Sequence, residues 1–383
     1  MYRPSQTWHH ASSSLSNSRS SRADPNYDGA RHTKEGLGNF STQSSTAGHA
    51  TAIDIFVAAL HEAGLPGPVV LIDETAEGAM IGRGSQFVVY KQKMAMPEFT
   101  QFSTRPVAVK VPRFPLDPKT PLKLVGSAAQ KHLHDMYLEV LALTNPTIRS
   151  HPHVARLLAW SHGIDTMNSP LTLVMELAHC SLRSFLQNQS DEQVDMPLKY
   201  QFCRNIAAGV DVLHECGFIH GDLKPDNILI FKNRKGDYVA KVADFGLSVT
   251  EVISDAGVNI VASIGGTYGW QAPEVEQGRN VPRDHWISTD NYSFGLLVWS
   301  VVLLDGVVPP RNVGSPQSLT ARQHVEAFKR ELESDIWQSL AGALDKTLRE
   351  DPSQRPDYLQ PLLSERRVSD QDLYVQQSRL ALH

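Results

Sequence analysis

Cysteine is scarce in this sequence of 383 residues. It has three cysteines, Cys180, Cys203 and Cys216, and none of them stands in a Cys-x-x-Cys spacing. A small odd number without that spacing argues against a disulfide framework and against a cysteine-based zinc site. We therefore expect a protein of a reducing compartment.

Strong charge of one sign and long apolar runs are also missing. The formal net charge is −5 and the pI is near 6.3, which gives no electrostatic reason to expect nucleic acid or an anionic membrane as a partner. The most apolar window, residues 294–304, is too short to span a bilayer and is predicted to be a buried helix. The first five residues lack the apolar stretch of a secretory signal, so we expect an intracellular, cytoplasmic protein without a membrane span.

Large aliphatic residues are almost absent from residues 1–50, where serine is abundant instead. Such a segment buries too little apolar surface to offset the entropy of ordering its backbone, so it is predicted to be a disordered extension. A polar tail is expected at the other end, over residues 363–383.

From residue 51 the pattern becomes that of a folded domain. A short helix and strand over residues 51–74 are expected to lead into it. Apolar patterning then predicts strands at 81–90, 106–111 and 171–176 and helices at 125–143, 198–215 and 294–304. We expect the connection 91–105 to be a surface insertion, because it is longer than a hairpin needs. Strands followed by helices predict an α+β fold of two lobes with a cleft between them.

Two short motifs carry the chemistry. Residues 220–227 read His-Gly-Asp-Leu-Lys-Pro-Asp-Asn, and residues 244–246 read Asp-Phe-Gly. Phosphoryl transfer needs a carboxylate to orient the acceptor hydroxyl, a cation beside the moving phosphoryl group and oxygen ligands for magnesium. The motifs contain this set of groups in Asp222, Lys224, Asn227 and Asp244.

These motifs resemble the catalytic loop and the magnesium loop of the eukaryotic protein kinase superfamily, and of its serine/threonine class in particular. The resemblance covers residues 75–362 and implies a β-rich N-lobe at 75–178 and a helical C-lobe at 179–362. It also implies a role for each motif residue: Asp222 receives the substrate hydroxyl, Lys224 neutralises charge on the γ-phosphate, and Asn227 and Asp244 hold Mg²⁺.

A nucleotide site is implied by the same resemblance. Lys110, at the end of Val107-Ala108-Val109-Lys110, matches the lysine that contacts the α- and β-phosphates, and Glu139 matches the glutamate that pairs with it. Gly82-x-Gly84 resembles the loop that covers the phosphates of ATP. The residues matching the adenine pocket are Val89, Ala108, Met175, Glu176, Ala178 and Leu229.

Two positions depart from the family pattern. The third glycine of the phosphate-covering loop is Phe87, which makes the loop less flexible. The arginine usual after the histidine is Gly221, so the usual receptor for a phosphate on the activation segment is missing. We therefore expect activity to depend little on phosphorylation of Ser248, Thr250, Ser254 and Ser263.

The stretch from Gly266 to Glu274 resembles the end of a kinase activation segment, which forms a platform for a peptide. Within this resemblance, Glu274 is expected to form a buried bridge with Arg355. Asp290 is expected to hold the backbone of the catalytic loop, and His220 to pack against Phe245.

The sequence thus predicts an ATP- and Mg²⁺-dependent protein kinase that phosphorylates serine and threonine hydroxyls of protein substrates. Two alternatives stay open. A small-molecule phosphotransferase could share His-Gly-Asp, but that class does not bring the Gly-Thr and Ala-Pro-Glu platform. A pseudokinase scaffold is suggested by Phe87 and Gly221, although the full set of expected polar positions is present: Lys110, Glu139, Asp222, Asn227 and Asp244.

Overall fold

The structure of the protein is a computed structural model. It describes residues 59–72, 79–84, 87–97, 102–112, 127–162, 171–188, 194–233, 235–250, 264–310, 317–328 and 334–363. All of them belong to one compact unit, Ala47–His383. The expected extension at residues 1–50 and the tail after Leu363 lie outside the described residues, and of the helix expected within 51–74 only residues 59–62 are described, as helix.

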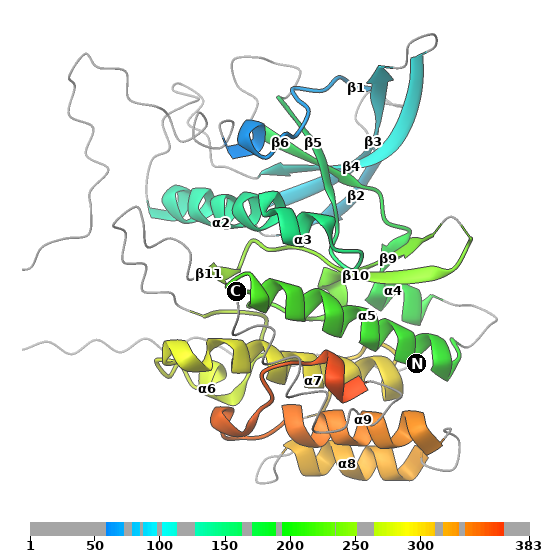
Figure 1. The fold of residues 1–383 in the computed structure, drawn as a ribbon, viewed down its shortest axis with the longest axis vertical. Helices are drawn as coiled ribbons and strands as arrows, with labels where there is room; N and C mark the ends of the chain where they lie inside the picture. Colours follow the sequence, from blue (N-terminus) through cyan, green and yellow to red (C-terminus); the bar gives the residue numbers. More distant parts are fainter. Residues whose placement is uncertain are drawn as a thin grey trace, which may run out of the picture. The chain divides into compact units, whose positions relative to one another are not determined.

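The first part of this unit is a six-stranded sheet with the order β1-β3-β4-β6-β5, in which β2 pairs with β3 (Figure 1). Every neighbouring pair is antiparallel. Valines of β4 and β6 form a small apolar cluster with residues of β3 and β5, as their β-branched pattern predicts. The strands are β1 (Leu71–Ile72), β2 (Ala79–Arg83), β3 (Phe87–Pro97), β4 (Phe102–Pro112), β5 (Leu157–His162) and β6 (Leu171–Glu176).

The expectation of a surface insertion over residues 91–105 is wrong. Strands β3 and β4 continue through most of it and form one long hairpin, paired from Phe87↔Pro112 to Pro97↔Phe102. Lysine, glutamine and proline interrupt the apolar alternation here, so local pattern gives no strand signal. Continuous antiparallel pairing extends both strands in spite of that composition.

The helix predicted at 125–143 is α2 (Ser127–Thr144), followed by the short α3 (Pro146–Ser150). Buried residues of α2, including Met136, Val140 and Leu143, join the main hydrophobic core. This packing fixes the helix beside the sheet, and with it the position of Glu139.

The second part is mainly helical (Figure 1). Its helices are α4 (Leu182–Gln187), α5 (Met196–Glu215), α6 (Pro273–Glu276), α7 (Trp286–Leu303), α8 (Gln317–Phe328) and α9 (Ser334–Thr347). Helix α5 begins at an Asp195 cap, whose side chain accepts a hydrogen bond from the Leu198 N–H at 3.0 Å. Helix α7 is buried from Thr289 to Val302, which explains why its sequence is apolar on all sides.

Two small sheets flank the loops that contain the sequence motifs at 220–227 and 244–246. Strands β7 (Cys180–Ser181), β9 (Ile228–Lys232) and β10 (Tyr238–Val242) form one, and β8 (Phe218–Ile219) with β11 (Val249–Thr250) forms the other. Residues 220–227 therefore run from β8 to β9, and residues 244–246 run from β10 to β11. The described part of the chain holds no helix with the length and apolarity that crossing a membrane requires.

Candidate active site

The backbone of residues 220–222 is anchored by Asp290, a residue of the buried helix α7. Its carboxylate accepts hydrogen bonds from the N–H of His220 at 2.6 Å and of Gly221 at 2.9 Å, and lies 3.0 Å from Nε2 of His214. Burial alone would raise the pKa of Asp290, but the His214 contact and these bonds hold the pKa below its ordinary value. The His220 ring lies 5.5 Å from the ring of Phe245, so both expected contacts are confirmed.

Asp222 is the centre of a compact polar cluster and is only 7% exposed. Its carboxylate lies 2.5 Å from Nζ of Lys224 and accepts hydrogen bonds from Nδ2 of Asn227 at 3.0 Å and from the N–H and hydroxyl of Thr267 at 2.8 and 2.7 Å. Lys224 in turn donates to the Thr267 hydroxyl at 2.6 Å. The carboxylate and the ammonium group are thus held next to each other by the end of the activation segment.

Lys110 brings a second cation into the site from β4. Its ammonium group forms ion pairs with Glu139 of α2 and, at 2.9 Å, with Asp244. Burial lowers the pKa of Lys110, but the two carboxylates outweigh it and raise the pKa above its usual range. Partial desolvation of the half-exposed Asp244 carboxylate would raise its pKa, but the Lys110 charge outweighs this effect and lowers the pKa. Both groups therefore stay ionised near neutral pH.

The ring of Phe87 also contacts Lys110. The Nζ atom lies 4.2 Å from the ring centroid, which is cation–π distance, and Phe87 is only 5% exposed. The sequence identified Phe87 as a departure from the glycine pattern but gave no position for its side chain.

The residues expected around adenine lie on neighbouring strands and on the segment after β6. Ala108 pairs with Met175 and Val107 with Glu176, so β4 faces the end of β6. In the glycine-containing segment, Gly82 pairs with Val89, and the Gly84 N–H donates to the Phe87 carbonyl at 2.8 Å. Ala178 follows β6 and Leu229 lies on β9, and the residues next to them are bonded, because the His179 N–H donates to the Ile230 carbonyl at 2.8 Å.

Asn227 and Asp244 offer the oxygen ligands that Mg²⁺ prefers. The Asn227 amide N–H groups donate to Asp222, so the amide oxygen is the atom that could bind a metal ion. The Asp244 side chain is 50% exposed and is therefore accessible to such an ion. Magnesium in nucleotide enzymes takes one or two protein oxygens and completes its shell with phosphate and water. The donor set fits such an ion. Among the described residues, no group of three or more His, Cys, Asp or Glu side chains could hold a metal by itself.

Two ion pairs beside the site were not foreseen from the sequence. Lys241 of β10 binds the Glu176 carboxylate at 2.6 Å, and the same carboxylate accepts the Arg156 N–H at 2.9 Å. Arg183 of α4 binds Asp226 with Nε and Nη2 at 2.7 to 2.9 Å. The partners are 65 and 43 positions apart in sequence, so no local pattern joins them.

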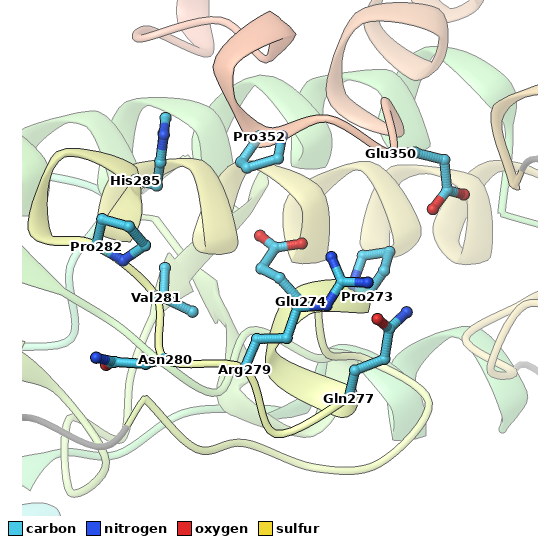
Figure 2. Close-up of a pocket in the computed structure, with 10 residues that line it drawn as sticks. All are labelled: Pro273, Glu274, Gln277, Arg279, Asn280, Val281, Pro282, His285, Glu350 and Pro352. Carbon is cyan, nitrogen blue, oxygen red and sulfur yellow. The ribbon is translucent and has the colours of Figure 1, made fainter.

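The end of the activation segment is fixed by the predicted bridge. Arg355 binds Glu274 through both terminal nitrogens, at 2.6 and 2.9 Å, with both side chains almost fully buried. A pocket of about 370 Å³ lies beside this bridge, between α6, the loop after it and residues 350–352 (Figure 2). None of the predicted site residues, all of which the structure describes, lines this pocket.

Comparison with known proteins identifies the family. Residues 76–363 match the protein tyrosine and serine/threonine kinase family. This match covers more than half of the chain, so the chain belongs to the protein kinase family. The β-sheet part and the helical part described above form the bilobal α+β fold of that family.

Individual relatives are named kinases as well. A probable serine/threonine-protein kinase of Dictyostelium discoideum is 31% identical over 216 residues, which are 56% of this chain and 19% of that protein. The serine/threonine/tyrosine-protein kinase HT1 of Arabidopsis thaliana is 26% identical over 263 residues, 67% of this chain and 59% of that protein. A serine/threonine-protein kinase-like protein of the same plant is 30% identical over 236 residues, 61% of this chain and 62% of that protein. The chain thus spans less than two thirds of the length of each of these relatives.

Proposed function

We propose that the chain is an ATP-dependent protein kinase that transfers the γ-phosphoryl group of ATP to serine and threonine hydroxyls of protein substrates. The observation that carries this proposal is a pair of polar clusters. Lys224 and Thr267 bind the Asp222 carboxylate, and Lys110 pairs with Glu139 and Asp244. The Lys224 charge acts on Asp244 and so links the two clusters. The relatives named serine/threonine kinases support the same reaction.

Each residue of the cluster has a role that its contacts support. Asp222 orients the acceptor hydroxyl, and Lys224, held beside it, offsets negative charge that develops on the transferred group. Lys110, kept in place by Glu139, contacts the phosphates of the nucleotide. Asn227 and Asp244 would hold Mg²⁺, which neutralises phosphate charge when it is bound.

The adenine end of the nucleotide is proposed to lie among the residues at the end of β6 and the strands facing it. Backbone groups of residues 176–178 would form its hydrogen bonds. Gly82 and Gly84 would let the backbone of this segment approach the phosphates without obstruction by side chains. The apolar lining is proposed to consist of Val89, Ala108, Met175 and Leu229.

We also propose the domain limits and setting. The kinase domain would span residues 75–362, with the N-lobe ending at residue 178, an N-terminal extension at 1–50 and a tail at 363–383. The three cysteines are free thiols, which suits a reducing, intracellular compartment. A net charge of −5 favours protein over nucleic acid as the macromolecular substrate.

The test is phosphorylation of generic protein substrates with labelled ATP and magnesium. Asp222→Asn should lower kcat by about 100-fold or more, since it removes the carboxylate that orients the hydroxyl. ATP binding should persist, and the products should contain phosphoserine and phosphothreonine. Asp345→Asn is the matched control, because Asp345 is a partly exposed residue of α9 outside the proposed site. Normal turnover by the Asp222 variant would show that the catalytic residue is another one.

A further inference from the structure

The side chain of Phe87 lies on the same face of its strand as Val89. Alternate residues of a strand share a face, and Val89 pairs directly with Lys110 of β4. The contact between the Phe87 ring and the Lys110 ammonium group agrees with this placement. The ring thus lies at the phosphate end of the proposed nucleotide site, two residues along β3 from the residue proposed to cover adenine.

Among the described residues, the Phe87 ring is a third neighbour of the Lys110 ammonium group. Glu139 and Asp244 pair with this group, and the ring centroid lies 4.2 Å from Nζ. Lys110 is only 8% exposed and Phe87 5% exposed. A phosphate group that contacts Lys110 must therefore displace at least one of these neighbours.

Of the three neighbours of the ammonium group, the aromatic ring is the one that cannot stay in place beside a bound phosphate. The face of an aromatic ring carries partial negative charge, which attracts the ammonium group and repels an anion. The carboxylate of Asp244 can remain near a phosphate group, because a magnesium ion can bind to both and offset their repulsion. The Phe87 ring has no such intermediary, so it must leave when phosphate arrives.

We propose that Phe87 is a specificity-determining residue, which weakens the binding of ligands in proportion to the phosphates they place at Lys110. The proposal rests on the proposed function, since it takes the nucleotide to bind with its phosphates at this lysine. ATP loses affinity because it displaces the ring from its buried position. Adenosine, which has no phosphate, binds at the other end of the site and leaves the ring in place.

The experiment measures the affinities of the full chain for ATP and for adenosine by titration calorimetry, in magnesium-containing buffer. Phe87→Val removes the ring and keeps a β-branched residue that suits strand β3. It should raise the affinity for ATP roughly tenfold or more, because binding no longer exposes a buried aromatic side chain. The affinity for adenosine should change by less than about twofold, because adenosine does not displace the ring.

Matched variants keep the test decisive. Phe87→Tyr preserves the ring over Lys110 and should leave the ratio of ATP affinity to adenosine affinity unchanged. If Phe87→Val does not fold, Phe87→Leu fills more of the buried volume without an aromatic face and should still raise that ratio.

Three results would decide against the inference. A lower or unchanged ATP affinity in the valine variant would overturn it while leaving the proposed function intact. An equal gain for ATP and adenosine would leave their ratio unchanged, place the effect at the adenine end and overturn it too. If neither the parent nor the variants bound either ligand, both the inference and the proposed nucleotide site would be wrong.

Discussion

Gly221, which replaces the arginine of the family pattern, is required by the packing of its own backbone. Its φ is +77°, a conformation that side chains disfavour, and a Cβ atom there would lie 2.6 Å from the Leu247 carbonyl oxygen. A Cβ atom on Gly266 would in turn lie 2.6 Å from the Gly221 carbonyl oxygen. Three backbone segments of the site therefore meet at a distance that only glycine allows.

Gly221→Ala should destabilise the protein and lower turnover more than Gly278→Ala does. Gly278 has a φ of +65° but open space around its Cβ position, so it isolates the conformational cost, about 1–2 kcal/mol. The clash with Leu247 should add about 1–3 kcal/mol to the loss of unfolding free energy at Gly221. Urea unfolding of both variants measures the difference, and equal losses would contradict the close approach.

At the scale of elements, the four-residue helix α6 is too short to be stable by itself. Its Glu274 binds Arg355, which also donates to the carbonyls of Arg349, Ser288 and Glu350 and lies 4.8 Å from the ring centroid of Tyr292. All the N–H groups of the buried guanidinium group thus donate hydrogen bonds. These bonds connect α6 with the start of α7 and with the segment after α9.

Glu274→Gln should lower the free energy of unfolding by about 3–5 kcal/mol, because it leaves the Arg355 charge buried without its partner. The control is Asp345→Asn, which removes the charge of the partly exposed Arg349–Asp345 pair and should cost at most about 1 kcal/mol. Urea unfolding compares the two. Similar losses would mean that the buried bridge contributes no more than a surface pair.

At the scale of the whole molecule, the sequence predicted the contacts of the motif residues, but it predicted few of the features that depend on pairing between distant segments. The contacts of Asp222, Lys110 and Asp290 follow from motif order, because each motif corresponds to one place in the fold. The continuation of strands β3 and β4 through residues 91–97 and 102–105 was missed, since the register is set across strands and the composition here is that of a loop. The position of the Phe87 side chain needed that register as well.

The activation segment is expected to work without phosphate. Ser248 is buried, and no described residue bonds to its hydroxyl, while Ser254 and Ser263 lie outside the described residues. The described end of the segment is held by Thr267 through its bonds to Asp222 and Lys224. These contacts need no added charge.

Replacing Ser248, Thr250, Ser254 and Ser263 together with alanine should therefore keep kcat within about threefold of the parent, because no phosphate–arginine contact is lost. Phosphatase treatment of the parent should have the same small effect. Thr267→Ala is the contrasting variant and should lower kcat strongly, since it removes the hydroxyl shared by Asp222 and Lys224. A large loss in the fourfold variant would show that another cation receives a phosphate there.

The Lys241–Glu176 ion pair joins strand β10 to the end of β6, and so connects the strand that precedes Asp244 with the segment proposed to bind adenine. Residues 153–156 join both ends of it: the Ala155 N–H donates to the Val242 carbonyl at 2.9 Å, and the Glu176 N–H donates to the Arg156 carbonyl at 3.1 Å. The segment proposed to bind adenine and the strand β10, which ends two residues before Asp244, are thus both bonded to residues 153–156. We expect a displacement of the end of β6 to displace β10 and the segment that carries Asp244 as well, so that the adenine and magnesium ends of the proposed site change position together.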